Sequence, residues 1–300
     1  MKKILAVALA ALMALSMVAC TGGGNVDDSI DDYTADENEL ITDTGTFTFA
    51  EGAADTAILV SYRGKATHND KVTVPQTFNN RPVTVIGERA FYQLSSVVEV
   101  VLPSTITAVK EYAFAGCVNL SALTWKDEAT GAVSSGNALP DGVESIGMCA
   151  FADCSSLATL GLGKSLETIG DFAFATCTKL TEINLPDTTE TVGEGAFWKC
   201  SALTAFDSNN VKKIGTLALY ECVSIEKITL SDLVEEIGAF AFVTETSTLK
   251  DKIDVDSFKN NEYLIEYYDE IAEPEKDEDA TTEEEVTTEE EETTEADTEA

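Results

Sequence analysis

The 23-residue stretch VESIGMCAFADCSSLATLGLGKS, from Val143 to Ser165, decides the fold because the chain repeats it. Aligning the chain against itself recovers three related stretches: VTVIGERAFYQLSSVVEVVLPST from Val83, LETIGDFAFATCTKLTEINLPDT from Leu166 and TETVGEGAFWKCSALTAFDSNN from Thr189. A fixed period of roughly 20 to 50 residues predicts a solenoid, in which each unit buries its apolar edge only against its neighbours.

One large apolar position per unit marks the period. It is occupied by Phe91, Phe114, Phe151, Phe174, Phe197, Leu219 and Phe242. The steps between them are 23, 37, 23, 23, 22 and 23 residues, and the step of 37 equals one period plus an insertion within residues 126–142. The phenylalanines are therefore predicted to form a structural ladder that runs through the core.

The spacing inside a unit predicts its local structure. An Ile or Val lies five residues before the aromatic position, an Ala one before and a Cys three after, which suits one face of a short helical turn. Apolar residues nine and eleven after it fit alternate positions of a short strand. A glycine four residues before it is expected to turn the chain with positive φ. This glycine is Gly87, Gly147, Gly170, Gly193, Gly215 or Gly238, and only the second unit has Lys110 instead.

Five cysteines share the position three residues after the aromatic one: Cys117, Cys154, Cys177, Cys200 and Cys222. Coils that pair through a sheet lie about 4.8 Å apart, within reach of a disulfide. The favoured interpretation is a ladder of small buried thiols, because the position shares its register with core Phe and Leu residues. A disulfide ladder is the alternative. No metal site is predicted, since CxxC pairs are lacking.

The stretch VESIGMCAFADCSSLATLGL resembles the BspA-like leucine-rich repeat of bacterial surface proteins, and the likeness extends over roughly residues 83–243. Leu94, Leu219 and Glu245 depart from its core, Ile-Gly-x-x-Ala-Phe-x-x-Cys-x-x-Leu. The resemblance implies an α/β solenoid, a leucine-rich-repeat right-handed coil with one short parallel strand and one helical turn per 22–23 residue repeat. It also implies a β-rich N-terminal cap.

The N-terminus is predicted to be an export signal. Lys2 and Lys3 precede an apolar run from Ile4 to Ala19 that is too short for a comfortable membrane span. The run ends at Cys20 in an arrangement that resembles a bacterial lipoprotein lipobox, which implies that Cys20 is lipidated. An ordinary signal peptide is the alternative. The expected location is the bacterial cell membrane, as a lipoprotein displayed on the outer surface.

The net charge of −35 disfavours binding to nucleic acids and to anionic lipid headgroups. Much of it lies in two strips: residues 26–44 hold eight acids and no base, and residues 273–300 hold fifteen acids and one lysine. The predicted organisation is a signal peptide at 1–19, an acidic flexible linker at 20–44, a β-rich cap at 45–82, the leucine-rich-repeat solenoid at 83–250, a C-terminal cap helix at 251–272 and a disordered Thr/Glu tail at 273–300.

Two sets of side chains are candidates for binding. Residues eight and ten after the aromatic position are expected on the outer face of the sheet, which repeat proteins use for partners. They include Glu99, Val101, Thr124, Thr159, Glu182, Asn184, Asp207, Lys227 and Thr229. An ordinary solvated face is the alternative. Tyr92, Trp198 and Tyr220 directly follow the aromatic position; they are expected to fill gaps between coils, and exposed binding anchors are the alternative.

No catalytic residue and no cofactor are predicted. His68 is the single histidine and is expected on the surface, and motifs of metalloproteases, nucleotide-binding loops and nucleophile elbows are absent. The sequence favours a lipid-anchored surface protein that binds proteins or glycans, with a role in adhesion to host or neighbouring cells. The alternative is an envelope scaffold that self-associates through its repeats; an enzyme is disfavoured.

Overall fold

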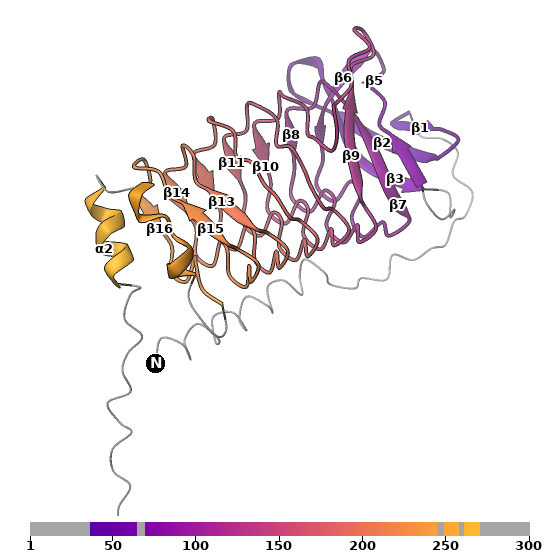
Figure 1. Cartoon of the computed structure of the whole chain (residues 1–300). Helices are drawn as coiled ribbons and strands as arrows, with labels where there is room; N and C mark the ends of the chain where they lie inside the picture. Colours follow the sequence, from indigo (N-terminus) through magenta and orange to yellow (C-terminus); the bar gives the residue numbers. More distant parts are fainter. Residues whose placement is uncertain (1–36, 65–69, 245–248, 258–260, 271–300) are drawn as a thin grey trace, which may run out of the picture.

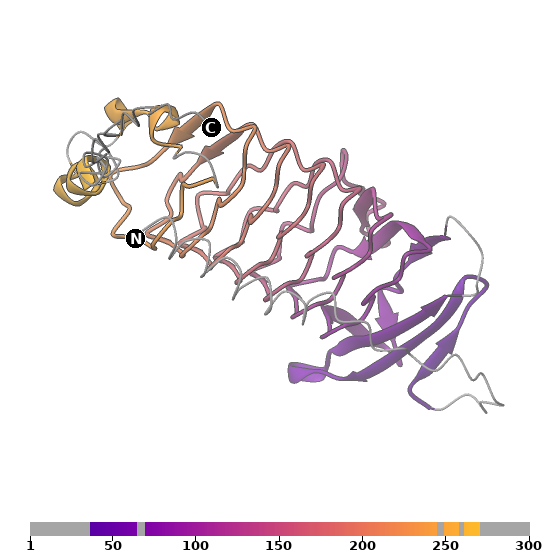
Figure 2. The same ribbon diagram turned by 90° about the horizontal axis from the view of Figure 1, so that it is seen from below.

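The computed structural model describes residues 37–64, 70–244, 249–257 and 261–270. Its body is a β-solenoid in which the repeats stack as coils along one axis, with a β-rich cap at one end and a short helix at the other (Figures 1 and 2). Each coil carries two strand positions joined by turns, and the side chains of successive coils fill the space between them. The solenoid expected from the repeat is therefore present.

The N-terminal cap is built from antiparallel strands that end in a parallel pairing with the first coil. Its elements are β1 (Glu39–Ile41), β2 (Gly45–Glu51), the single 3-10 turn η1 (Ala53–Asp55), β3 (Ala57–Gly64), β5 (Thr77–Phe78) and β6 (Arg81–Ile86). β2 pairs with β1 and β3 antiparallel, and β3 pairs with β6 parallel. Because β1 belongs to the cap sheet, the cap begins before residue 45, inside the stretch expected to be linker.

A parallel sheet runs along the whole solenoid from β6. Its remaining strands are β8 (Ala108–Val109), β10 (Ser145–Ile146), β11 (Thr168–Ile169), β12 (Thr191–Val192), β14 (Lys213–Ile214) and β16 (Glu236–Ile237). The Ile or Val five residues before the aromatic position is the second residue of each of these strands. This position was expected in a helical turn, and that expectation is wrong: it lies in a strand whose partners are the same positions of the neighbouring coils.

The second strand position is the one predicted from the alternating pattern, and it is less regular. β4 (Asp70–Thr73), β7 (Val97–Pro103) and β9 (Ala122–Lys126) form one sheet, and β13 (Ala205–Asp207) pairs with β15 (Lys227–Thr229) in another. The coils between them keep only isolated bridges, which include that of Thr159 with Glu182. This part of each coil is thus extended throughout, but it forms a continuous ladder only near the two ends.

Turns replace the predicted helix between the two strand positions. In the coil of Phe174, the amide of Ala173 bonds the oxygen of Gly170, and that of Cys177 bonds the oxygen of Phe174. The third residue of each turn has positive φ, 55° at Phe172 and 59° at Thr176, as type II turns require. The amides of Phe172, Phe174 and Thr176 bond carbonyls of the next coil instead of their own. The helical turn per repeat is therefore absent, because these amides pair between coils.

The repeated glycine serves close packing and not a left-handed turn. None of the six predicted glycines has positive φ. A Cβ built on Gly170 would lie 2.7 Å from the backbone carbon of Gly147, and the corresponding nearest contacts at all six positions lie between 2.1 and 2.7 Å. Successive coils therefore approach through their backbones at this corner, which leaves no room for a side chain.

The core is a stack of rings and apolar side chains along the axis. Phe91, Phe114, Phe151, Phe174 and Phe197 are buried, and consecutive rings lie 4.9 to 5.5 Å apart within 7° of parallel. Leu219 interrupts the stack, and beyond it the buried Phe242 meets the edge of Tyr267. These contacts place the predicted aromatic position at the centre of every coil.

At the C-terminal end, side chains bond the backbone groups that a further coil would otherwise pair with. Two 3-10 turns, η2 (Lys250–Lys252) and η3 (Val255–Ser257), precede the helix α2 (Glu262–Glu270). The hydroxyl of Tyr263 accepts a hydrogen bond from the amide of Ile237 on the edge strand β16 at 2.8 Å. The side-chain amide of Asn261 donates to the oxygens of Asp232 and Val234. Backbone groups that a neighbouring coil would satisfy are thus occupied at this end.

Candidate binding surfaces

The predicted outer sheet face begins beside the N-terminal cap. Glu99 pairs in register with Lys71 and Ala122, and the Lys71 ammonium lies 2.6 Å from the Glu99 carboxylate. Val101 lies between Thr73 and Thr124 in the same sheet. Glu99, Val101 and Thr124 are each half-buried. This end of the face therefore presents one ion pair, between Lys71 and Glu99, and the half-buried side chains of Val101 and Thr124.

The insertion divides the predicted outer sheet face. Ala138 pairs with Gly161 and its amide bonds the oxygen of Leu123, so the insertion lies between two coils at the strand position. The Asn137 side chain bonds the amide of Leu123 at 3.3 Å and the oxygen of Ser121 at 2.8 Å. The predicted outer-face residues from Glu99 to Thr229 therefore form two patches, one on each side of the insertion.

The C-terminal patch holds most of the exposed polar side chains. Thr159, Glu182, Asn184, Asp207 and Lys227 are exposed, while Thr229 is half-buried. Backbone pairing aligns Thr159 with Glu182, and Asp207 with Thr229. The Asn184 amide donates to the Glu182 carboxylate at 2.5 Å. We call these six residues the sheet patch.

Charges at the end of the sheet patch are paired. The Lys227 ammonium lies 3.0 Å from the carboxylate of Asp254, and this hydrogen bond holds the pKa of Asp254 below its ordinary value. The Asp207 carboxylate accepts a hydrogen bond from the amide of Asn209. The patch therefore presents hydroxyls, an amide and both signs of charge on neighbouring coils, which suits hydrogen-bonded recognition.

The cysteine position lies in the core. Cys117, Cys154, Cys177, Cys200 and Cys222 are fully buried and carry free thiols. Burial raises the pKa of Cys117 and Cys177 to about 12, and it raises the pKa of the other three above the ordinary value. Thiols that stay protonated are poor nucleophiles and poor metal ligands. Within the described ranges, no group of three or more His, Cys, Asp or Glu residues could hold a metal ion.

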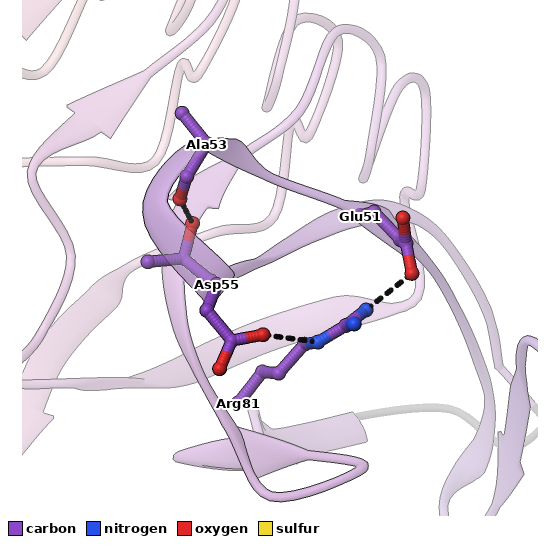
Figure 3. Close-up of polar contacts among 5 residues, drawn as sticks. Glu51, Ala53, Asp55 and Arg81 are labelled. Carbon is purple, nitrogen blue, oxygen red and sulfur yellow. Dashed lines mark hydrogen bonds and ion pairs between the residues drawn. The ribbon is translucent and has the colours of Figure 1, made fainter.

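The cap contains a cavity of about 320 Å³ that the sequence did not indicate. Its lining includes Glu51, Phe78 and Arg81. The Arg81 guanidinium bonds the carboxylates of Glu51 at 2.5 Å and Asp55 at 2.8 Å (Figure 3). Both acids raise the pKa of Arg81. Two carboxylates already neutralise this cation, so the arrangement ties β6 to β2 and η1 and offers little to an anionic ligand.

The aromatic residues Trp198 and Tyr220 were expected to fill gaps between coils. They are buried, in a second cluster that is separate from the main core. Tyr92 packs against this cluster and is half-buried. Each of these three residues directly follows the aromatic position of its unit, and adjacent residues of a turn point to opposite sides. Their spacing in the sequence therefore indicates this second cluster.

Two predicted residues are outside the described ranges: Cys20, the proposed lipid attachment, and His68. Among the residues that the structure does describe, no helix has both the length and the apolar character to cross a bilayer.

The sequence matches a family described as "BspA type Leucine rich repeat region", with six copies over residues 69–136 and 134–250. The chain belongs to this family. Membership in the BspA-type family agrees with the resemblance carried by residues 143–162, and it supports a repeat-based binding or scaffold role.

Solved structures of other bacterial repeat proteins are similar to this BspA-type chain. The leucine-rich repeat protein of T. pallidum is 26% identical with a TM-score of 0.58, and the likeness covers 76% of this chain and 94% of that one. A leucine-rich repeat protein from Bacteroides ovatus is 27% identical with a TM-score of 0.47, over 68% of this chain and 57% of that one. No curated protein matches the chain.

Proposed function

We propose that this BspA-type protein is a lipid-anchored, surface-displayed binding protein that recognises proteins or glycans through the sheet patch. The observation that carries the proposal is the register of Thr159, Glu182, Asn184, Asp207 and Lys227, which are exposed on one side of successive coils. Side chains held by backbone pairing keep fixed separations, so an extended partner meets a preformed row of contacts.

The chemistry of the sheet patch indicates the class of ligand. It consists of two hydroxyls, one amide, two carboxylates and one ammonium group. A surface of this kind bonds sugar hydroxyls or polar protein loops, and its affinity comes from many hydrogen bonds spread over several coils. We assign to it a role in adhesion to host or neighbouring cells.

The anchor is proposed from the N-terminal sequence. Lys2 and Lys3, the apolar run 4–19 and the following Cys20 fit a lipoprotein signal, and two or more acyl chains give stable attachment. The acidic strip before the cap would then hold the solenoid away from a negatively charged bilayer surface. We infer that the protein is exported and displayed on the outer surface of the bacterial cell membrane. We expect the unaltered protein to incorporate labelled palmitate. We expect Cys20→Ala to abolish this incorporation.

A self-associating scaffold is the second candidate. End-to-end stacking of solenoids needs a free coil surface, and the contacts of Asn261 and Tyr263 with the last coil disfavour it. These two contacts do not oppose a scaffold in which solenoids associate side by side through their repeats.

Binding of purified protein to host matrix proteins and cell-wall glycans tests the proposal. Glu182→Lys and Lys227→Glu reverse exposed charges of the sheet patch. A ligand that binds to the unaltered protein in this assay should not bind to these variants. The matched control is Glu190→Lys with Lys212→Glu, an exposed ion pair of 2.7 Å elsewhere on the solenoid. Unchanged affinity of the sheet-patch variants would contradict the proposed site. Sedimentation at rising concentration tests the scaffold.

A further inference from the structure

The cavity in the N-terminal cap has a polar lining and one aromatic wall. Its volume of about 320 Å³ lies at the lower end of the roughly 300 to 1,000 Å³ that small-molecule sites occupy, so it suits a small ligand. Sites of this kind combine apolar or aromatic surface with a few converging polar groups. The lining residues that supply both are Glu37, Asn38, Glu51, Phe78, Asn79 and Arg81.

Three of these residues belong to one hairpin. β5 and β6 pair antiparallel with Phe78 opposite Arg81, and Asn79 and Asn80 form the turn between them. Both turn residues have positive φ, 50° and 63°, as in a type I′ turn, and asparagine tolerates this conformation. Such a turn fixes the register of its flanking strands, so this side of the cavity is in place before a ligand arrives, which lowers the entropic cost of binding.

The Phe78 ring is held by the core of the cap. It stacks on the buried Phe49 with 4.3 Å between the ring centres and 16° between their planes. Phe78 itself is half-buried and lines the cavity. The face of an aromatic ring carries partial negative charge, so it attracts C–H groups that carry partial positive charge. The cavity therefore has a rigid wall suited to the C–H face of a ligand.

The Arg81 guanidinium keeps donors for a ligand after it has made its internal contacts. Its Nε bonds Asp55 at 2.8 Å and its Nη1 bonds Glu51 at 2.5 Å (Figure 3). A guanidinium has five N–H groups and a carboxylate has two oxygens. The remaining N–H groups of Arg81 and the second oxygen of Glu51 thus lie side by side, as donors and an acceptor whose positions the ion pairs fix.

Three further lining residues have polar groups that the protein does not use. Glu37, Asn38 and Asn79 are exposed, and their side chains make no hydrogen bond or ion pair with the part of the chain that the structure describes. A carboxamide both donates and accepts hydrogen bonds, whereas a carboxylate accepts them. The cavity therefore offers donors and acceptors from several elements of the cap.

The mixture of charges favours a neutral ligand rich in hydroxyls. An anion in the cavity would meet the carboxylates of Glu37 and Glu51, and a cation would meet the Arg81 guanidinium. A hydroxyl donates to a carboxylate and accepts from a guanidinium or an amide, so a polyol satisfies all of these groups. A sugar ring also holds several C–H groups on one face, and this face matches the Phe78 ring.

We propose that the cap cavity binds one neutral sugar ring of a glycan, with a C–H face of the ring on Phe78 and its hydroxyls bonded to Glu51, Asn79 and Arg81. The inference adds a second binding site to the proposed function, at the N-terminal end of the solenoid. It does not depend on the sheet patch, which lies on the other side of the insertion.

Saturation-transfer NMR on the purified protein tests this site. The probes are methyl β-galactoside, methyl β-glucoside and methyl α-mannoside, which are neutral single rings. We expect at least one to bind saturably with a Kd on the order of 1 mM. For the galactoside, the protons on C3, C4 and C5, which share one face, should receive the strongest transfer from the protein. Phe78→Leu keeps an apolar side chain and should weaken binding by about threefold to tenfold.

The hairpin offers a matched pair of variants. Asn79→Gly and Asn80→Gly each place a glycine at positive φ, where it is tolerated, but only Asn79 lines the cavity. Asn79→Gly should weaken binding of the sugar by about threefold to tenfold, the effect of one or two hydrogen bonds. Asn80→Gly should leave the affinity unchanged. Thermal unfolding of each variant shows that the fold is kept.

Charged sugars test the preference for a neutral ring. Glucuronate should bind at least about threefold more weakly than methyl β-glucoside, because Glu37 and Glu51 repel it. Protonated glucosamine should bind no more tightly than the neutral ring, because Arg81 lies in the wall. The sheet-patch variants Glu182→Lys and Lys227→Glu should leave the affinity for these sugars unchanged, so failure of the proposed function and failure of this inference are distinguishable.

Three results would overturn the inference. One is the absence of saturable binding by all three neutral glycosides. Another is an equal effect of Asn79→Gly and Asn80→Gly, which would place the sugar elsewhere on the molecule. The third is tighter binding of protonated glucosamine than of the neutral rings, which would assign the cavity to a cation.

Discussion

The thiol of Cys200 donates a hydrogen bond to the backbone oxygen of Phe174, which lies 3.1 Å away in the preceding coil. Four further thiols make the same contact with Phe91, Phe114, Phe151 and Phe197 at 2.9 to 3.2 Å. A cysteine at this position is small enough for the core and still gives a donor to a buried carbonyl. The recurrence of cysteine is thereby explained without disulfides.

The buried thiols predict loss of stability at alkaline pH. Burial raises the pKa of Cys177 from its ordinary value of 9.0 to about 12. Below pH 9 both the folded and the unfolded chain hold this proton, and the full stability is present. Above it the unfolded chain releases a proton that the folded chain keeps, so the free energy of unfolding falls as pH rises from about 9 to 12.

Denaturant unfolding at pH 8 to 10.5 measures this effect. Cys177→Val removes one such thiol at similar volume, so its unfolding free energy should fall less steeply above pH 9, by up to about 1.4 kcal/mol per pH unit. Identical slopes for the two chains would show that the thiol titrates normally in the folded state.

The ring stack predicts a large cost for truncating Phe174. Its ring is fully buried, 5.3 Å from Phe151 and 5.5 Å from Phe197. Phe174→Ala should lower the free energy of unfolding by about 3 to 5 kcal/mol in urea titrations, because it opens a cavity in the core. Phe174→Leu should cost less, since Leu219 occupies the equivalent place in its own coil. A loss below about 1 kcal/mol for the alanine variant would argue against this register.

Gly170→Ala should destabilise the solenoid by about 1 to 3 kcal/mol, a typical cost of overpacking. Its new methyl group would meet the backbone of the preceding coil at 2.7 Å. Gly136→Ala is the matched control, because a Cβ there has no atom within 4 Å. Thermal unfolding compares the two, and equal transition temperatures would refute the close approach of the coils at this corner.

Removing the Tyr263 hydroxyl should expose the end of the long sheet. Tyr263→Phe keeps the ring but leaves the amide of Ile237 without its 2.8 Å partner, and Asn261→Ala frees two further carbonyls. The double variant is expected to associate end to end with rising concentration in sedimentation experiments, because an unpaired strand edge recruits another. Tyr268→Phe, elsewhere on α2, serves as control. A monomeric double variant would show that the closing contacts do not prevent association.

The repeat period predicted the core and the register. Phe174 lies between Phe151 and Phe197 because identical positions of identical units must stack, and this follows from spacing alone. The kind of local structure did not follow from spacing. Side chains at −5, −1, 0 and +3 share a face in a helix and also in a chain of consecutive turns, so Ile169 and Phe174 fit either. The choice depends on where the amides pair, and in this fold the amide of Phe172 bonds Glu194 of the next coil.

The binding surfaces were predicted less completely. Alternation correctly separated the buried Ile183 from the exposed Glu182 and Asn184. The sequence did not reveal that the insertion enters the sheet at Ala138, because a segment rich in small residues has no distinctive periodicity. It also did not reveal that Phe172 joins Trp198 and Tyr220 in the second cluster, since the positive φ that directs Phe172 away from the core has no glycine to mark it.

The pairing of turn amides with the next coil has a mechanical consequence. These hydrogen bonds point along the axis of the stack, so a force that pulls the two ends of the molecule apart loads the coil interfaces one after another. Each interface can then open separately, and the chain released by each coil is far longer than the coil's share of the stack. A cell held to a surface through such a molecule would be tethered by an extensible spring that lengthens step by step under shear.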